Sequence, residues 1–321
     1  MRFTPLAAES LGVRSMCTYV ETPDVRILID PGVSLGPRFS LLPHPKEYRA
    51  LISARNRLSS IAKQAEIVTI SHYHFDHATP AYTDYVWNFS NLAVAEQLYK
   101  DKLVFAKDYR SAINPSQRRR GWMLHQTMEK SVCRFEVADG QVYIIGGTKL
   151  KFSEPVYHGE RGSVLGWVLM LTVEHDDERF LHASDVQGPI VPETAEKIIA
   201  EKPKMLYIGG PPTYLAEYRQ LTSKVESAWD SLERIVRVVP QVIIDHHFMR
   251  AGEWPLNFMR VIDASKEAGH RICTAAQALG MMNELLESQR MKLYLEEPPS
   301  KEFLDWTRLP DERRRLTMPP V

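Results

Sequence analysis

The short stretch SHYHFDH, residues 71–77, constrains the fold of this chain more than any other segment. It places three histidines and an aspartate within six positions, directly after the apolar run EIVTI. Such a run is typical of a short buried strand, and residues just beyond a buried strand lie on a loop that the sheet holds rigidly. The pattern therefore predicts a functional site at the end of a strand.

Histidine and aspartate supply the neutral nitrogen and anionic oxygen ligands that zinc, iron and manganese bind. His72 and His74 are two positions apart, so their side chains point the same way in an extended backbone. Asp76 and His77 follow where the chain turns, and they can face a second ion. In a chain with 11 histidines among 321 residues, this pattern should arise by chance on the order of once in a thousand chains. A solvated polar loop is therefore the less favoured interpretation.

Further residues of metal-binding type lie at the ends of other apolar runs. His158 follows FSEPVY, Asp185 follows RFLHAS, and His246 and His247 follow QVIID. Each of these residues taken alone is more often structural, but a two-metal site needs about this many additional ligands. The sequence therefore predicts that these strand ends meet at the loop formed by residues 71–77.

Apolar runs and amphipathic segments alternate along the chain, which predicts an α/β fold. Strands are expected at 15–22, 25–32, 66–70, 133–137, 141–147, 149–156, 166–174, 179–184, 205–210, 241–245 and 271–275. Helices are expected at 46–64, 192–201, 223–237, 256–268 and 276–289, and within a mostly helical segment over 79–130. We expect one domain over 1–321, with a surface tail at about 295–321 that is rich in proline and charge.

Composition disfavours several classes of protein. The 40 Lys and Arg residues balance the 40 Asp and Glu residues, so no overall charge attracts the chain to nucleic acid or to an anionic membrane. No run approaches the length of about 18 apolar residues that a membrane span needs. The cysteines Cys17, Cys133 and Cys273 are far apart and form no CxxC motif, which is typical of a protein in the reducing cytoplasm.

The successive motifs LIDPG, SHYHFDH, VYHG, HASDVQG and IIDHH resemble those of the metallo-β-lactamase superfamily of hydrolases. More narrowly, the chain resembles an uncharacterised archaeal branch of predicted metal-dependent hydrolases. The resemblance runs through most of the chain and implies a four-layer αβ/βα sandwich with two divalent metal ions at one edge of the facing sheets. In this chain the fold would carry a mostly helical insertion after the metal loop.

The resemblance also implies a role for each candidate ligand. One ion would be held by three histidines, His72, His74 and His158. The other would be held by Asp76, by Asp185, which would bridge both ions, and by one histidine of the pair His246 and His247, with His77 beside Asp76. The ions would be zinc, with iron, manganese or nickel as alternatives.

Two details of the ligand set follow from how the motifs align. Alignment on the end of the strand selects His246 as the last ligand, whereas alignment on the following HF selects His247; the first is slightly favoured. Asp30 of LIDPG would orient the metal loop through hydrogen bonds.

The resemblance implies that a metal-bridging hydroxide attacks a phosphoester, an ester or a lactone. Asp76, as a metal ligand, and His182 are the candidate catalytic residues, and His182 or Tyr214 could protonate the leaving group. The alternative for His182 is a histidine that faces the core, and the alternative for Tyr214 is a structural turn.

The aromatic side chains of the segment 79–130 are more typical of core packing, and the alternative is that the segment forms a lid over the site. Within it, Arg118, Arg119 and Arg120 can bind a phosphate group as guanidinium forks, or they can form a solvated helix face. Arg161 in HGERGS is a further candidate for contact with an anionic substrate.

Three functions remain open. The first is a cytoplasmic hydrolase of small phosphoesters, esters or lactones. The second is a nuclease acting on RNA or single-stranded DNA, which the neutral total charge disfavours. The third is a non-hydrolytic or redox member of the superfamily, which His74 disfavours because the di-iron redox branch commonly has glutamate at that position. The sequence predicts no oligomeric state.

Overall fold

The computed structural model describes residues 1–215, 222–252 and 256–321. Two sheets form the centre of the fold. The first contains, in spatial order, β1 (Arg2–Pro5), β2 (Thr18–Glu21), β3 (Arg26–Ile29), β4 (Ile67–Ile70), β5 (Leu103–Ala106) and β6 (Arg134–Val137). The second contains β15 (Arg271–Cys273), β14 (Gln241–Ile244), β13 (Met205–Ile208), β12 (Glu178–His182), β11 (Leu171–His175), β8 (Thr148–Phe152) and β7 (Val142–Ile145). A short ladder pairs β9 (Val156–Tyr157) with β10 (Trp167–Val168).

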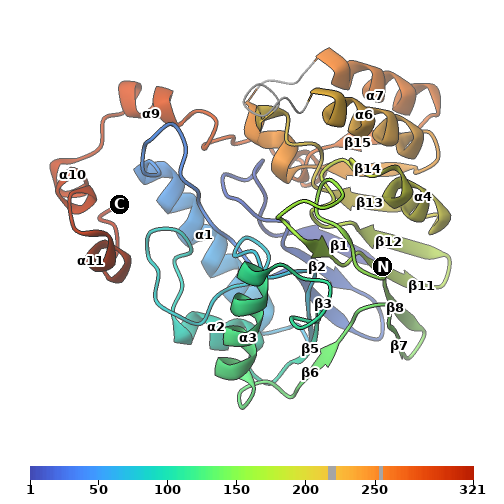
Figure 1. The fold of residues 1–321 in the computed structure, drawn as a ribbon, viewed down its shortest axis with the longest axis horizontal. Helices are drawn as coiled ribbons and strands as arrows, with labels where there is room; N and C mark the ends of the chain where they lie inside the picture. The colour runs from blue at the N-terminus through green and yellow to red at the C-terminus, as the bar shows by residue number, and fades with distance from the viewer. Residues whose placement is uncertain (216–221, 253–255) are drawn as a thin grey trace.

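Helices lie on the outer sides of the two sheets (Figure 1). The first sheet is accompanied by α1 (Pro45–Ala62), α2 (Leu92–Tyr99) and α3 (Pro115–Met128). The second is accompanied by α4 (Pro192–Ala200), α6 (Thr222–Val236) and α7 (Leu256–Glu267). The short elements are η1 (Thr213–Leu215), η2 (His246–Ala251), α8 (Ala275–Ala278), α9 (Arg290–Glu296), α10 (Lys301–Thr307) and α11 (Asp311–Leu316).

The strands alternate between two apolar layers, because successive strand residues point to opposite faces of a sheet. In β3, Ile27 belongs to the layer between the sheets, whereas Leu28 faces the side of α1. In β13, Tyr207 faces the other sheet, whereas Leu206 faces the side of α6. Both sheets are therefore buried on both faces, and the fold is the expected four-layer αβ/βα sandwich.

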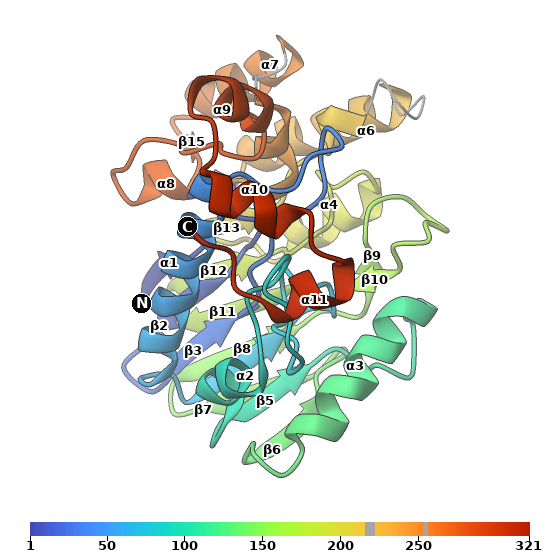
Figure 2. The same cartoon turned by 90° about the vertical axis from the view of Figure 1, so that its left-hand side faces the viewer.

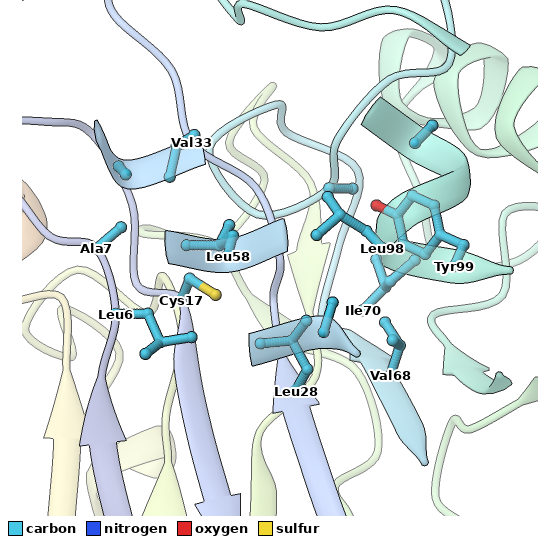
Figure 3. Close-up of a cluster of buried hydrophobic side chains, with 14 of the residues drawn as sticks. Leu6, Ala7, Cys17, Leu28, Val33, Leu58, Val68, Ile70, Leu98 and Tyr99 are labelled. Carbon is cyan, nitrogen blue, oxygen red and sulfur yellow. The ribbon is translucent and has the colours of Figure 1, made fainter. Parts of the chain in front are cut away.

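The outer layer of the first sheet is shown in Figure 3. Side chains of β3 and β4, including Leu28 and Val68, pack with Leu58 of α1 and with Leu98 and Tyr99 of α2. All five side chains are fully buried. This layer fixes the end of β4, from which the loop of 71–77 leaves the sheet.

Parallel strands in each sheet bring several loops to one edge. Strands β3 to β6 are parallel neighbours, and so are β12 to β15. Ligands of such sheets bind outside the carboxyl ends of the strands. The motifs LIDPG, SHYHFDH, HASDVQG and IIDHH follow β3, β4, β12 and β14 at these ends.

The segment 79–130 differs from the mostly helical insertion that we expected. It contains β5, which pairs in parallel with both β4 and β6. The apolar run LVFA forms this strand within a segment whose composition is otherwise polar and aromatic. The helices of the segment are α2 and α3.

The helix expected over 276–289 is wrong. The structure has only α8 there, and Gly280 follows it with a left-handed φ of 72°. The Met281 N–H donates to the Ala276 carbonyl at 2.9 Å, which satisfies the helix end as in a Schellman motif.

The tail after residue 295 carries exposed charges but is anchored by aromatic side chains. Phe303 and Trp306 of α10 are buried, and their rings lie 5.9 Å and 5.5 Å from the ring of Tyr48 in α1. In Figure 1, α10 and α11 lie on the side of the molecule that carries α1, and α11 contacts the loop before α2, where the Tyr85 N–H donates to the Arg315 carbonyl at 2.9 Å. In the described part of the chain, no helix is both long and apolar enough to cross a membrane.

Candidate metal centre

Four predicted ligands converge where β4, β9 and β12 end. His72 and His74 lie in the loop after β4, His158 follows β9, and Asp185 follows β12, with ligand atoms all within 4.8 Å of one another. His74 Nδ1 lies 3.1 Å from His72 Nε2 and 3.2 Å from His158 Nε2. Two nitrogens bound tetrahedrally to one zinc ion lie about 3.3 Å apart. The three histidines therefore have the spacing of ligands to a common ion.

A second group lies beside the first and shares Asp185 with it. Asp76, His77 and His246 form one such cluster, and His246 is also grouped with Asp185 and His247. Asp185 Oδ2 lies 3.0 Å from His158 Nε2 in the first group and 3.4 Å from His246 Nε2 in the second. One oxygen of Asp185 thus lies close to histidines of both groups.

Two buried atoms of the centre show how well these residues fit a cation. Asp185 Oδ1 and His247 Nε2 lie 3.0 Å apart, yet neither has a hydrogen-bond partner of acceptable geometry among the described residues. Leaving buried polar atoms unsatisfied is unfavourable. A divalent cation bound by Asp185 would satisfy this carboxylate oxygen, and a polar group of a substrate would satisfy the imidazole nitrogen, so the residues present fit a metal centre.

Burial keeps several of the candidate ligands in the neutral form that binds metal. Burial and the nearby His158 lower the pKa of His74 to about 3, and burial lowers the pKa of His247 to about 4. Burial and the neighbouring imidazoles also hold the pKa of His72 well below its usual value.

In the second group, neighbouring carboxylates raise the pKa values of the histidines. Burial alone would lower the pKa of His246, but Glu9 and Asp185 raise it to about 9. Burial is likewise outweighed at His77, where Asp185 and Asp30 raise the pKa. The carboxylates therefore favour positive charge at this position, which a bound cation would supply.

Asp30 lies where the sequence expectation put it, beneath the metal loop. It is fully buried and accepts hydrogen bonds from the Ser71 backbone N–H at 2.7 Å and the Ser71 hydroxyl at 2.6 Å. Its Oδ2 lies 2.8 Å from His77 Nδ1, so Nε2 of that ring is directed toward Asp185. A Cβ at the nearby Gly32 would lie 2.4 Å from the backbone nitrogen of His77, so only glycine fits there.

Sequence reasoning missed two buried residues that support His246. Glu9 Oε2 lies 2.8 Å from His246 Nδ1, and Glu9 Oε1 accepts a hydrogen bond from Arg250 Nε at 2.5 Å. Arg250 Nη2 also lies 3.4 Å from Asp76 Oδ2. Arg250 could have been identified from the sequence because it follows His246 by only four residues. Glu9 lies 237 residues from His246, so no sequence pattern links the two.

The two adjacent histidines take different positions in the centre. The His246 imidazole faces Asp76 and Asp185, at 3.6 Å and 3.4 Å from their Oδ2 atoms. The His247 ring is stacked with that of Tyr214, at 6.4 Å and an interplanar angle of 10°. The backbone of His246 has a positive φ of 56°, which turns the chain between the two side chains.

A cavity of about 740 Å³ opens onto the ligands. Its wall includes the candidate ligands His74, Asp76, His158, Asp185 and His247. Tyr214 and Arg120, two of the residues predicted to contact substrate, also line it.

Three other predicted residues lie elsewhere. Arg118 does not line this cavity, and its guanidinium donates to the Arg110 carbonyl at 3.3 Å. Arg161 is exposed and pairs with Glu193 at 2.5 Å. His182 is buried, with Nε2 3.0 Å from the Met16 carbonyl oxygen, a placement that fits the alternative of a histidine facing the core.

The four layers, together with a His and Asp cluster at the carboxyl ends of the parallel strands, define a metallo-β-lactamase-fold protein. Solved structures with some similarity include the metallo-β-lactamase-fold protein YhfI from Bacillus subtilis, which is 10% identical over 81% of this chain and 89% of that chain, with a TM-score of 0.45. A diphosphatase from the PhnP family is 11% identical over 79% of this chain and 92% of that chain, with a TM-score of 0.42.

Sequence relatives identify the family more narrowly. UPF0282 protein MK0213 from Methanopyrus kandleri is 41% identical over 298 residues, which cover 92% of this chain and 100% of that protein. A UPF0282 protein from Pyrobaculum arsenaticum is 39% identical over 311 residues, covering 95% and 99% of the two chains. The chain belongs to the UPF0282 family. No family model matches the chain.

Proposed function

We propose that the protein is a hydrolase that uses two divalent cations to cleave a phosphoester or a related ester or lactone. The observation that carries this proposal is the position of Asp185, whose Oδ2 lies within 3.4 Å of a histidine from each ligand group. A two-cation centre, when loaded, supplies a water of lowered pKa and stabilises negative charge on a substrate oxygen. Zinc suits the nitrogen-rich ligand set, and iron and manganese are the alternatives.

Separate sets of residues would hold the two cations. His72, His74 and His158 would hold one cation, and Asp76, His77 and His246 the other. Asp185 would contact both. Asp30 and Glu9 act as positioning residues, because each accepts an Nδ1–H and leaves the opposite ring nitrogen directed at the centre.

The remaining polar groups on the cavity wall are placed to contact substrate. Tyr214 Oη lies 3.4 Å from His247 Nδ1 and 3.4 Å from Arg250 Nη1. These side chains form one side of the cavity that contains the ligands, and they offer hydrogen-bond donors to an oxygen of the substrate. We expect His247 and Tyr214 to affect turnover more than metal content.

Metal analysis combined with a substrate screen tests the proposed function. We expect up to two transition-metal ions per chain, and hydrolysis of a chromogenic phosphodiester, phosphomonoester, lactone or thioester that a chelator stops and added zinc restores. A protein shown to hold two ions per chain that cleaves none of these four substrate classes would contradict the proposal.

The adjacent histidines provide a second test. His246→Ala should lose about one metal ion per chain, because the His246 ring lies between Asp76 and Asp185. His247→Ala should keep its metal content but lose roughly 10- to 100-fold in kcat/KM, as expected when a group that contacts substrate is removed. Metal content is measured by mass spectrometry and activity on the substrate found in the screen. Full metal content in both variants would show that His246 does not complete the second site.

A further inference from the structure

A second cavity lies beside the metal centre, between the loop after β4 and helix α3. It has a volume of about 480 Å³, within the usual range of small-molecule sites, roughly 300–1,000 Å³. Most of its wall is apolar, with contributions from Ala78, Pro80, Ala81, Met123 and Leu124. Helix α3, which forms one side of this pocket, lies at the edge of the molecule (Figure 2). We call this cavity the α3 pocket.

The α3 pocket and the metal-centre cavity share a wall. Phe75, Tyr82 and Arg120 line both of them. Phe75 stands in the sequence between the candidate ligands His74 and Asp76. The two cavities are therefore adjacent, with these three side chains at their boundary.

Arg120, on this shared wall, has no carboxylate partner among the described residues. Its guanidinium lies 4.2 Å from the centre of the Phe75 ring, and its side chain is partly buried. Three other arginines that line the metal-centre cavity are each paired: Arg14 with Glu287 at 2.6 Å, Arg250 with Glu9 at 2.5 Å, and Arg315 with Asp84 at 3.0 Å. Arg120 thus offers a positive charge next to the ligands that no described carboxylate pairs with at ion-pair distance.

We propose that the substrate is an amphiphilic phosphodiester, with one anionic phosphate oxygen bound by Arg120 and one apolar arm held in the α3 pocket. This inference rests on the proposed hydrolase function. In the reaction, the oxygen of water bonds to phosphorus, and the bond from phosphorus to the opposite ester oxygen breaks. The leaving oxygen takes that electron pair and one proton of the water, so it departs as an alcohol or phenol. The other proton stays on the phosphate monoester, whose apolar arm remains in the pocket.

The outer face of α3 does not favour a nucleic acid strand as the occupant. A strand needs a continuous row of cations and stacking rings leading to the site. Trp122 is 52% exposed there, but Arg118 is bonded to the Arg110 carbonyl, and Arg110 is paired with Asp108 at 2.9 Å. Among the three consecutive arginines of α3, Arg120 is the one that lines both the metal-centre cavity and the α3 pocket.

A series of alkylphosphonates with methyl, butyl and hexyl chains tests the inference by binding, measured calorimetrically on the metal-loaded protein. Each buried methylene should strengthen binding by roughly fourfold until the pocket is filled. The matching methyl, butyl and hexyl esters of p-nitrophenyl phosphate should show the same trend in kcat/KM.

Variants separate the two parts of the site. Ala81→Phe places a ring in the α3 pocket. It should lower the ratio of hexylphosphonate to methylphosphonate affinity by at least tenfold and leave methylphosphonate binding unchanged. Thr127→Phe, at an exposed position on the same wall, is a second variant that fills the pocket. Arg120→Ala should weaken all three phosphonates by roughly tenfold, as expected for the loss of a charge-assisted contact. Arg118→Ala and Trp122→Ala are the matched controls on α3 and should bind like the parent.

The outcomes distinguish this inference from the proposed function. Phosphonate binding that rises with chain length, without hydrolysis of any ester, would support the α3 pocket and overturn the hydrolase. Hydrolysis and binding that are both independent of chain length would overturn the α3 pocket and keep the hydrolase. Cleavage of a single-stranded oligonucleotide that is lost in Trp122→Ala would overturn the inference in favour of a nucleic acid substrate.

Discussion

Replacing both His74 and Asp185 with alanine should abolish tight metal binding and lower metal-dependent hydrolysis by at least about a thousandfold. His74 Nδ1 lies within 3.2 Å of two other histidine nitrogens, and Asp185 Oδ2 reaches both ligand groups. The double variant therefore removes one ligand of the first group and the bridge between the groups. Metal content per chain and rates on the screened substrate measure the effect.

Thermal unfolding separates metal loss from misfolding in this variant. A bound ion stabilises the folded state by about 2.7 kcal/mol when its free concentration is 100 times Kd, so a chelator should lower the Tm of the parent but not that of the double variant. Asp177→Ala, at an exposed position between β11 and β12, is the control and should behave like the parent. Full metal content in the folded double variant would contradict a dinuclear centre.

The second large effect is expected at a buried ion pair that does not line the metal-centre cavity. Glu47→Ala should lower the free energy of unfolding by about 3–5 kcal/mol. Glu47 in α1 accepts two hydrogen bonds from Arg290, at 2.7 Å and 2.8 Å, and both side chains are fully buried. The substitution leaves a buried guanidinium without its carboxylate, and urea unfolding followed by circular dichroism measures the loss.

An exposed pair serves as the comparison for this prediction. Asp305→Ala removes the contact of Asp305 with Arg308 at 3.1 Å, where both side chains are more than half exposed. Such a change should alter the unfolding free energy by no more than about 1 kcal/mol. If Glu47→Ala had an equally small effect, the bond from Arg290 to the Leu41 carbonyl at 3.1 Å would be enough to satisfy the guanidinium.

The candidate ligands could be predicted because their signal is local. His72, His74, Asp76 and His77 are neighbours in the sequence, and the strand before them sets their directions. Asp185 and the His246 and His247 pair follow strands of the parallel part of the second sheet, whose carboxyl ends lie at one edge. His158 also follows an apolar run, but its strand β9 belongs to the short antiparallel ladder. The strands expected at 15–22 and 25–32 are present as β2 and β3, which pair antiparallel across a short turn.

Contacts between residues far apart in the chain could not be predicted from the sequence. Glu9 reaches His246 across 237 residues, and no periodicity or motif marks that contact. Among three consecutive arginines, Arg120 lines the metal-centre cavity, whereas Arg118 and Arg119 do not. The rotation of α3 about its own axis decides this, and that rotation depends on how the helix packs against β5 and the metal loop.

The sequence by itself therefore determined most of the strands and the main helices, the chemistry of the candidate ligands and the strand ends that carry them, because each depends on residues close together in the chain. It did not predict β1 or β5. Only the tertiary structure decided which histidine of the pair faces Asp76, which buried carboxylates orient the imidazoles, and where the α3 pocket lies. Those features depend on side chains from separate layers meeting within 3–4 Å, as Glu9 and His246 do at 2.8 Å. Packing of the two sheets sets such distances, and local sequence patterns carry no information about them.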